Sequence, residues 1–175
     1  GLVAANYNKP SLGVAFIVTT GIRASNQNEE WTMKRWNGWG DDANDLNYEL
    51  SKSALGFLES LIGKATPLTD ATLEQVLTSV PASRLPAHAL YSIEAEERVR
   101  HARGQSLPDW LALRSGKLGT FPDAVAYPQN SEDVQALLRH ALTERIDLTI
   151  VGPEGPLVLG LVDAFTAAGL RCYGP

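Results

Sequence analysis

The segment of this chain best placed for chemistry is the turn Gly152-Pro153-Glu154-Gly155-Pro156. It follows an apolar run that predicts a β-strand and precedes a run with helical spacing. In sheets of parallel strands, ligands bind outside the carboxyl ends of the strands, where such turns lie. The turn therefore predicts part of a substrate-binding surface. The simpler alternative is an ordinary turn between strand and helix, in which Pro156 only starts the helix.

Residue types that commonly carry catalysis form no recognisable site elsewhere. His88, His101 and His140 lie in three separate segments and lack the i, i+4 spacing of a helical zinc pair. No Gly-x-Ser-x-Gly elbow surrounds any serine, and Ser106 has the position of a helix cap. Cys172 lies in a short apolar segment with nothing nearby to lower its pKa. We therefore predict no catalytic residue and no metal ligand.

Two further groups of residues have both a functional and a structural interpretation. Trp31, Trp36 and Trp39, with Arg35 among them, could form an aromatic patch for a ligand, but packing in a core or an interface is favoured. The segment from Glu94 to Arg103 alternates in charge, which predicts a solvated helix face with i, i+4 ion pairs.

Composition excludes several classes of protein. A chain of 175 residues with 44% hydrophobic and 20% charged residues can bury one core or two small ones. The net charge of −5 disfavours nucleic acid as a partner. The apolar run Leu12–Val18 is far shorter than the roughly 20 residues that cross a bilayer, so we expect no membrane span and interpret the run as a buried strand or a stray segment. A single cysteine is typical of a reducing compartment, which predicts a cytoplasmic protein.

The first half of the chain predicts short helices, because apolar residues recur every three or four positions between capping and stop residues. In the second helix, Asp70 would favour the positive end of the helix dipole. The predicted helices are Leu46–Ile62 before Gly63; a helix capped by Thr69 and ended by Pro81; Ile93–Arg103 between Ser92 and Gly104; and Pro108–Ser115 between Ser106 and Gly116.

The second half predicts strands that alternate with helices, which is typical of right-handed βαβ units with parallel strands. The fold class is thus α+β to α/β, a helical N-terminal half followed by a small parallel βαβαβ unit. Three strands leave a sheet face and edges uncovered, so we expect either a homo-oligomer through the exposed sheet or marginal stability. The predicted elements are a strand at Asp123–Tyr127, a helix at Ser131–Leu142 with Asn130 and Asp133 as caps, a strand at Ile146–Val151, a helix at Pro156–Ala168 and a strand at Leu170–Tyr173.

Several ordered blocks between residues 33 and 142 resemble the N-terminal part of the FAD-linked oxidases of the alkylglycerone-phosphate synthase type. These blocks are Trp36-Asn37-Gly38-Trp39-Gly40, Glu96–Leu107, Leu113-Arg114-Ser115-Gly116, Phe121–Pro128 and Glu132-Asp133-Val134. The resemblance implies FAD as the cofactor of the parent family, bound through a loop rich in glycine. Here Gly152–Pro156 replaces that loop. Its two prolines remove two amide donors, and its glutamate adds a negative charge. We therefore expect no tightly bound cofactor.

The last part of the chain, from about residue 143, resembles the N-terminal domain of phosphoribosylamine–glycine ligase, an ATP-grasp enzyme of purine biosynthesis. The resemblance rests on Ile146–Val158, Leu161–Phe165 and Gly169–Pro175. It implies a small phosphorylated metabolite as partner of the Gly152–Pro156 turn. The family's glycine-rich opening motif and its nucleotide domain have no counterpart here.

These observations divide the chain into residues 1–32, an unassigned leader; 33–120, a helical segment of the oxidase type; and 121–175, a composite βαβαβ unit whose two parents meet within about 131–145. A natural fusion, an engineered one and a joining error would look alike. The leading hypothesis is a fragment of an FAD-linked oxidoreductase that lacks the flavin phosphate loop and is inactive alone. The alternatives are a fragment of phosphoribosylamine–glycine ligase and a folded module without catalytic activity.

Overall fold

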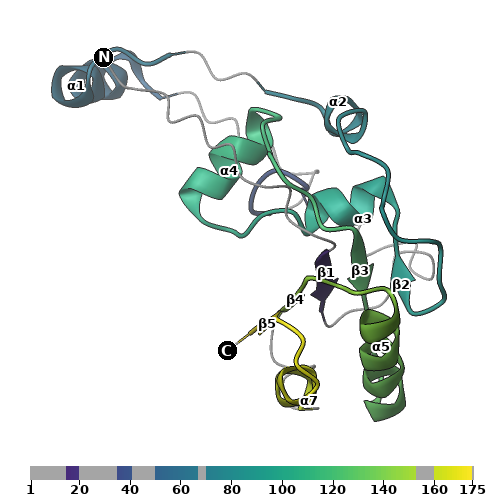
Figure 1. Ribbon diagram of the computed structural model, residues 1–175. Helices are drawn as coiled ribbons and strands as arrows, with labels where there is room; N and C mark the ends of the chain where they lie inside the picture. Colours follow the sequence, from purple (N-terminus) through teal and green to yellow (C-terminus); the bar gives the residue numbers. More distant parts are fainter. Residues whose placement is uncertain (1–14, 20–34, 41–49, 67–69, 153–159, 175) are drawn as a thin grey trace. The chain divides into compact units, whose positions relative to one another are not determined.

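The computed structural model describes residues 15–19, 35–40, 50–66, 70–152 and 160–174 (Figure 1). The chain divides into two compact units. Unit 1 comprises Gly1–Arg23, Pro81–Ala102 and Thr120–Pro175, and unit 2 comprises Ala24–Val80 and Arg103–Gly119. Within the described ranges, no helix is both long enough and apolar enough to span a membrane.

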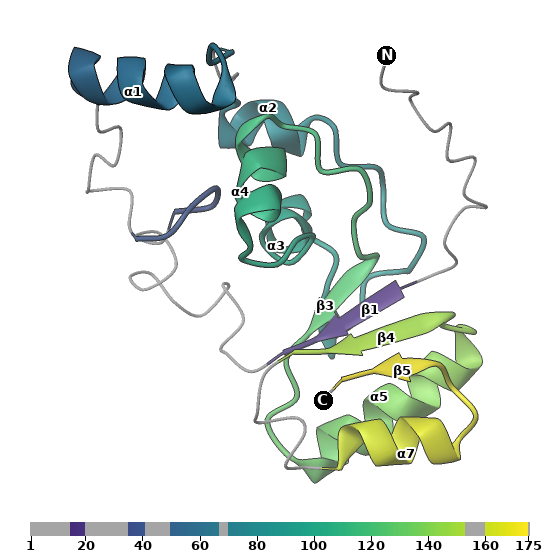
Figure 2. The same ribbon diagram turned by 90° about the vertical axis from the view of Figure 1, so that its left-hand side faces the viewer.

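Among the described residues, unit 1 contains a five-stranded sheet with the order β2-β3-β1-β4-β5 (Figure 2). Strands β3, β1, β4 and β5 run parallel, and β2 pairs antiparallel with β3. The α+β to α/β class with parallel strands is therefore confirmed, although the sheet is larger than the three strands predicted. The strands are β1 (Ala15–Val18), β2 (Tyr91–Ser92), β3 (Ala124–Ala126), β4 (Leu148–Val151) and β5 (Cys172–Tyr173).

Strand β1 lies at the centre of this sheet. Phe16 pairs with Ala124 of β3 on one side and with Thr149 of β4 on the other. The side chains of Phe16 and Val18 are completely buried. The part of the apolar run that the structure describes is thus a buried strand, one of the two interpretations that the sequence left open.

Helices α5 (Ser131–Thr143) and α7 (Leu161–Ala167) cover one face of the sheet (Figure 2). Leu137 and Phe165 from these helices join Phe16 in one buried apolar cluster. The Asn130 cap is confirmed, because its Oδ1 accepts the Asp133 N–H at 2.8 Å. The predicted helix Pro156–Ala168 is shorter in the structure: α7 begins after Gly160, and Pro156 lies outside the described residues.

The end of α5 adopts a conformation that normally favours glycine. Arg145 has a φ of 53°, and the next amide, of Ile146, donates to the Ala141 carbonyl at 2.9 Å. This is the Schellman arrangement, in which a left-handed residue satisfies the last carbonyls of a helix. It turns the chain back into β4.

Helix α3 (Ala95–Arg100) lies over β3 on the opposite face (Figure 2). The predicted helix Ile93–Arg103 was too long, and its predicted cap was wrong: Ser92 belongs to β2, and the helix begins after Glu94. The solvated face is also only partly correct. Arg100 pairs with Glu96, but Arg98 is 3% exposed and its guanidinium donates to the carbonyls of Pro122 and Pro81 at 2.6 and 2.7 Å.

Unit 2 contains the helices α1 (Lys52–Ile62), α2 (Leu73–Leu77) and α4 (Leu107–Arg114). The predicted cap Thr69 was wrong for α2. Thr72 caps it instead, because a capping box forms with Gln75, in which each side chain accepts the other residue's amide. The caps of α4 are confirmed: Ser106 accepts the Asp109 amide, and Gly116, with a φ of 70°, ends the helix in a Schellman arrangement.

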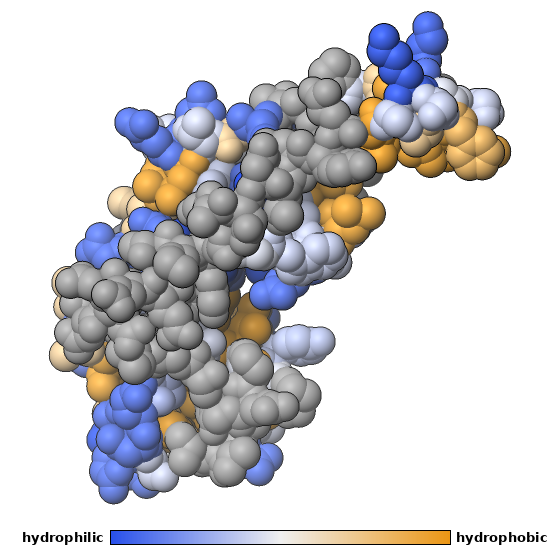
Figure 3. Space-filling model, turned by 180° about the vertical axis from the view of Figure 1, so that it is seen from behind, coloured by the Kyte–Doolittle hydropathy of each residue, from blue (hydrophilic) through white to orange (hydrophobic). Residues whose placement is uncertain are grey.

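Helix α1 confirms the predicted amphipathic helix and its stop at Gly63, although the predicted start at Leu46 lies outside the described residues. None of its side chains is buried, and Phe57, Leu61 and Ile62 are exposed. Figure 3 shows apolar surface along this helix. The periodicity therefore predicted the helix correctly, while burial of its apolar face is not observed.

Candidate functional site

The carboxyl ends of β1 and β4 form the candidate site of unit 1. From β1 the chain continues to β2 and β3 on one side of it, and α5 then carries the chain across to β4 on the other side. The strand order therefore changes direction between β1 and β4. In open α/β sheets, ligands bind outside the carboxyl ends of the strands at such a switch point.

Gly152 and Thr19 meet at this edge. The Gly152 amide donates to the Val18 carbonyl at 2.7 Å, and the Thr19 amide donates to the Ala126 carbonyl at 3.0 Å. A methyl group placed on Gly152 would come within 3.5 Å of Thr19 Oγ1, an ordinary van der Waals distance. Of the five predicted substrate-binding residues, Gly152 is brought to this edge. The others, Pro153, Glu154, Gly155 and Pro156, lie outside the described residues.

Sequence reasoning missed Thr19, since it lies in a segment with no recognised motif. It also missed a polar pair at the end of β3, where the Tyr127 hydroxyl donates to the Glu97 carboxylate. Both side chains are buried, and the His101 ring meets the Tyr127 ring edge-on at a centroid distance of 6.0 Å. Glu97 belongs to the charged stretch predicted to be solvated, so periodicity alone gave no signal for this contact.

The described residues at this edge do not fit the pyrophosphate of FAD. Binding of a pyrophosphate requires backbone amides without other acceptors. The Gly152 amide already donates to Val18, and the first turn of α5 is capped by Asn130. The Asp133 carboxylate accepts the Gln129 amide at 2.8 Å and adds negative charge to that helix end. A pyrophosphate at the start of α5 would therefore meet occupied donors and a like charge.

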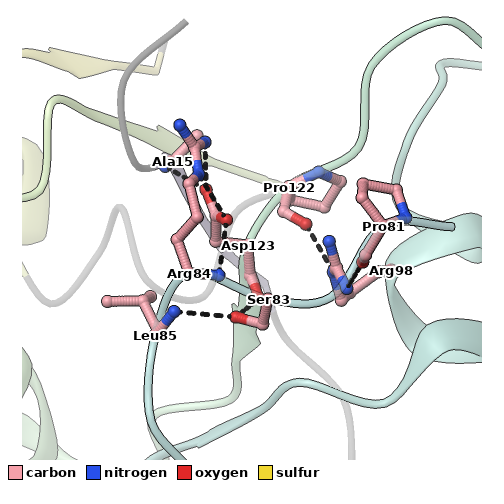
Figure 4. Close-up of polar contacts among 8 residues, drawn as sticks. All are labelled: Ala15, Pro81, Ser83, Arg84, Leu85, Arg98, Pro122 and Asp123. Atoms are coloured by element: carbon pink, nitrogen blue, oxygen red, sulfur yellow. Dashed lines mark hydrogen bonds and ion pairs between the residues drawn. The ribbon is translucent and has the colours of Figure 1, made fainter.

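Asp123 lies at the opposite, amino edge of the sheet and has a structural role (Figure 4). Its carboxylate accepts the Ala15 amide at 3.0 Å and the Arg84 Nη2 at 2.5 Å. Burial opposes ionisation of this group, but these hydrogen bonds outweigh it and hold the pKa of Asp123 below its usual range. The Pro122-Asp123 pair, part of the oxidase resemblance, thus positions β1 and the Arg98 side chain.

Two of the three histidines, which the sequence placed in separate segments, lie together in unit 1. The rings of His88 and His140 stack at a centroid distance of 4.4 Å, and His140 Nε2 lies 3.1 Å from the Tyr91 hydroxyl. Burial and the charge of His88 lower the pKa of His140. Among the described residues, no group of three or more His, Cys, Asp or Glu side chains could hold a metal ion. Cys172 is half-buried, and burial raises the pKa of its thiol.

In unit 2, Trp39 packs edge-on against Trp110 at a centroid distance of 5.9 Å, although it remains 61% exposed. Trp110 was missed by sequence reasoning, and Trp31 lies outside the described residues. Trp39 thus packs against another aromatic ring, but it is not buried in a core.

Comparison with known proteins finds sequence similarity in the last part of the chain and a similar fold over most of its length. Residues 106–175 match the family model described as phosphoribosylglycinamide synthetase, N domain. The phosphoribosylamine–glycine ligase of Salmonella typhi is 67% identical over 43 residues, which cover 25% of this chain and 10% of the ligase. The ligase of Allochromatium vinosum is 62% identical over 66 residues, which cover 38% of this chain and 15% of the ligase. The chain thus spans a small part of these enzymes.

Among solved structures, alkyldihydroxyacetonephosphate synthase has a similar fold, with a TM-score of 0.50 and 19% sequence identity. The match covers 75% of this chain and 29% of the synthase chain. At this identity the likeness shows the fold alone. Both predicted resemblances are therefore present, but the ligase match begins at Ser106, well before residue 143, and supports the ligase alternative better than the oxidase hypothesis. The chain is similar in sequence to the N domain of phosphoribosylamine–glycine ligase over residues 106–175, and similar in fold to alkyldihydroxyacetonephosphate synthase over most of its length.

Proposed function

We propose that unit 1 provides a substrate-binding surface of the phosphoribosylamine–glycine ligase type, and that it takes a small metabolite carrying a ribose phosphate at the carboxyl edge of β1 and β4. The observation that carries the proposal is that Gly152 and Thr19 lie next to each other at the switch point of the sheet. The segment that matches the ligase family contains β4 and Gly152, so sequence relatives and geometry point to the same edge.

The chemistry of this edge suits a polar ligand held by few groups. Thr19, which is 8% exposed, brings a hydroxyl, and Gly152 brings a backbone without a side chain of its own. A hydroxyl both donates and accepts, so it can bind a sugar hydroxyl or a phosphate oxygen. By their name, the relatives join phosphoribosylamine to glycine, and we assign the phosphoribosyl part to this surface. We expect binding without ligation from this chain alone, since it matches 15% or less of the first three of these enzymes.

Ribose 5-phosphate is a stable probe for this proposal. We expect it to shift the backbone amide resonances of Thr19 and Gly152 in NMR titrations, while ribose and inorganic phosphate at the same concentration give smaller shifts. Thr19→Val keeps the shape and removes the hydroxyl, so we expect affinity to fall about threefold to tenfold. Thr143→Val, on the exposed side of α5, is the matched control and should bind as the unsubstituted chain does. Equal binding by both variants would contradict the assignment of the site.

We also propose that the chain binds no FAD tightly, since the turn after β4 starts with an amide that already donates to Val18. The chain purified with excess FAD and then desalted should show no flavin absorbance near 450 nm. Flavin that remains in a 1:1 ratio after desalting would overturn this expectation and restore the oxidase hypothesis.

A second copy of the chain is the partner that we propose for the exposed side of the sheet. Ile150 and Tyr173 are register partners on β4 and β5, and both are exposed. Sheet edges with exposed apolar side chains favour pairing with another strand. Sedimentation equilibrium should give a dimer that Tyr173→Lys weakens. A monomer at all concentrations would exclude this partner.

A further inference from the structure

The two stacked histidines of unit 1 include one whose hydrogen bond depends on its protonation. His88 and Tyr91 form an isolated antiparallel bridge, so residues 88–91 make a tight turn that leads into β2. Inside this turn, the Leu90 amide donates to His88 Nδ1 at 3.2 Å. Because a backbone amide can only donate, Nδ1 must accept, and the neutral ring carries its proton on Nε2. The turn therefore requires a His88 ring without a proton on Nδ1.

A second set of contacts joins this turn to helix α5. The Tyr91 hydroxyl donates to the Pro86 carbonyl at 2.9 Å, so it accepts from His140 Nε2, which lies 3.1 Å away. The His88 ring stacks on the His140 ring at a centroid distance of 4.4 Å and on the Tyr91 ring at 5.4 Å. Tyr91 is 1% exposed, and its ring meets that of Phe16 at 5.1 Å. The turn and α5 thus meet through two histidine rings beside a buried tyrosine.

Strand β2 depends on this turn for its place at the edge of the sheet. It contains two residues, Tyr91 and Ser92, and pairs with β3. A strand this short forms few ladder hydrogen bonds, so its attachment depends on contacts outside the ladder. Tyr91 is the register partner of Ala126, whose carbonyl also accepts the Thr19 amide at 3.0 Å. The turn therefore adjoins the end of β3 that lies next to the candidate site.

Acid acts on this arrangement at two points. A proton on His88 Nδ1 removes the acceptor of the Leu90 amide and sets two N–H groups against each other. A proton on each ring of the stack places two positive charges at a centroid distance of 4.4 Å, where like charges repel. The Glu144 carboxylate acts on both His140 and Tyr91 and can offset one of these charges. Burial raises the pKa of Tyr91, so its hydroxyl stays neutral over the range in which histidines titrate.

We propose that His88 is the titratable group of a pH switch that controls the attachment of β2: the neutral ring holds the 88–91 turn and β2 against β3 and α5, and protonation releases them. An imidazole exposed to solvent binds a proton at about pH 6.5. The released segment gains protons below this pH, whereas the attached segment excludes a proton from Nδ1. By linkage, β2 is attached above about pH 6.5 and is released progressively as the pH falls below that value.

The position of the proton on His88 is the first test. In two-bond proton–nitrogen spectra at about pH 7.5, we expect His88 to carry its proton on Nε2. A proton on Nδ1 would overturn the proposal, since the ring could not then accept from Leu90.

Hydrogen exchange of the Leu90 amide reports the release, and exchange of the Leu137 amide within α5 reports unfolding of the surrounding structure. From about pH 7.5 to about pH 5, the protection of Leu90 relative to that of Leu137 should fall at least about tenfold. A constant ratio of the two protection factors would also overturn the proposal.

Three variants separate the switch from a general effect of acid. His88→Asn keeps an acceptor within reach of the amide two positions later, as in an Asx turn, but does not titrate, so its protection ratio should change less than about twofold over this pH range. His88→Ala lacks the acceptor and should show the low ratio already at about pH 7.5. The matched control is His101→Asn, because His101 Nδ1 lies 2.7 Å from the Glu97 carbonyl of α3 and not in the turn, and it should keep the full pH response.

Protection of the Leu137 amide shows in each variant that α5 remains packed on the sheet. A full pH response in a folded His88→Asn variant would overturn the proposal, because the response would then come from another group.

Discussion

The Asp123 carboxylate and the Arg84 guanidinium lie 2.5 Å apart, and the same carboxylate oxygen also accepts the Ala15 amide, 108 positions away in the sequence. One side chain thus joins the central strand β1 to the start of β3 and to the segment before β2. Asp123 is nearly completely buried, whereas the Arg84 side chain is 46% exposed. The stability of the sheet should therefore depend on Asp123 more than on Arg84.

Replacement of Asp123 by Asn should lower the free energy of unfolding by about 1 to 3 kcal/mol, because the amide keeps the size of the side chain but loses the charge that Arg84 and the Ala15 amide bind. Urea unfolding followed by circular dichroism measures this. The exposed pair Asp147–Arg171 provides the control, since Asp147→Asn should change stability by less than about 0.5 kcal/mol. Equal losses in the two variants would mean that Asp123 does not bind β1 in solution.

The lowered pKa of Asp123 predicts how the stability of the folded chain depends on pH. The pKa of Asp123 is lower in the folded chain than in the unfolded one, so its stabilisation is complete above the unfolded pKa of about 3.9 and is lost as the pH falls through the folded value. The pKa of Asp70 is also lowered, first by its hydrogen bond from Arg114. Urea midpoints measured from pH 6 down to pH 2 should fall less steeply for Asp123→Asn than for the unsubstituted chain.

His140 predicts a second loss of stability on acidification, which begins at a higher pH than the loss caused by Asp123. Burial and the charge of His88 lower the pKa of His140, and the charge of Glu144 opposes them. The unfolded chain therefore binds a proton more readily, so the stabilisation is complete above about pH 6.5 and is lost as the pH falls below that value. His140→Gln should flatten the stability profile between about pH 7 and 5. An unchanged profile would mean that the His88–His140 stack does not affect titration.

Two leucines of α5 provide a test of which face of the helix packs on the sheet. Leu137 is completely buried and Leu142 is 48% exposed. Leu137→Ala should cost about 2 to 5 kcal/mol, because it leaves a cavity in the apolar cluster. Leu142→Ala should cost less than about 1 kcal/mol, since little buried surface is lost and alanine favours helix. A reversed order in urea unfolding would require a rotated helix.

Substitutions at the C-terminal ends of α5 and α4 should change stability in opposite directions. Arg145 adopts a left-handed conformation that disfavours side chains, so Arg145→Gly should stabilise unit 1 by about 0.5 to 1 kcal/mol. Gly116→Ala should destabilise unit 2 by at least about 1 kcal/mol, because its φ is 70° and the added methyl group would meet Ala71 Cβ at 3.1 Å. Thermal unfolding of the two variants should show shifts in opposite directions, and shifts of the same sign would argue against these helix ends.

The local elements of the chain were readable from the sequence because their determinants lie within a few residues of one another. The side chains of Ser106 and Asn130 bind amides three positions away, and Gly116 ends α4 through its own backbone conformation. The cap of α2 was the exception. Thr69 and Thr72 are both capping residues by type, and only Thr72 has a glutamine three positions later to complete the box.

The sequence by itself determined the fold class, the helix-rich first half and the edge of the sheet at which Gly152 lies. Only the tertiary structure showed β1 at the centre of the sheet, Thr19 beside Gly152, the stacked pair His88 and His140, and the contact of Trp39 with Trp110. These contacts join residues that are far apart in the chain, and parallel strands have no turn between them to show which strands pair. Periodicity reports which face of a helix or strand is apolar, but the partner of that face depends on the packing of the whole unit.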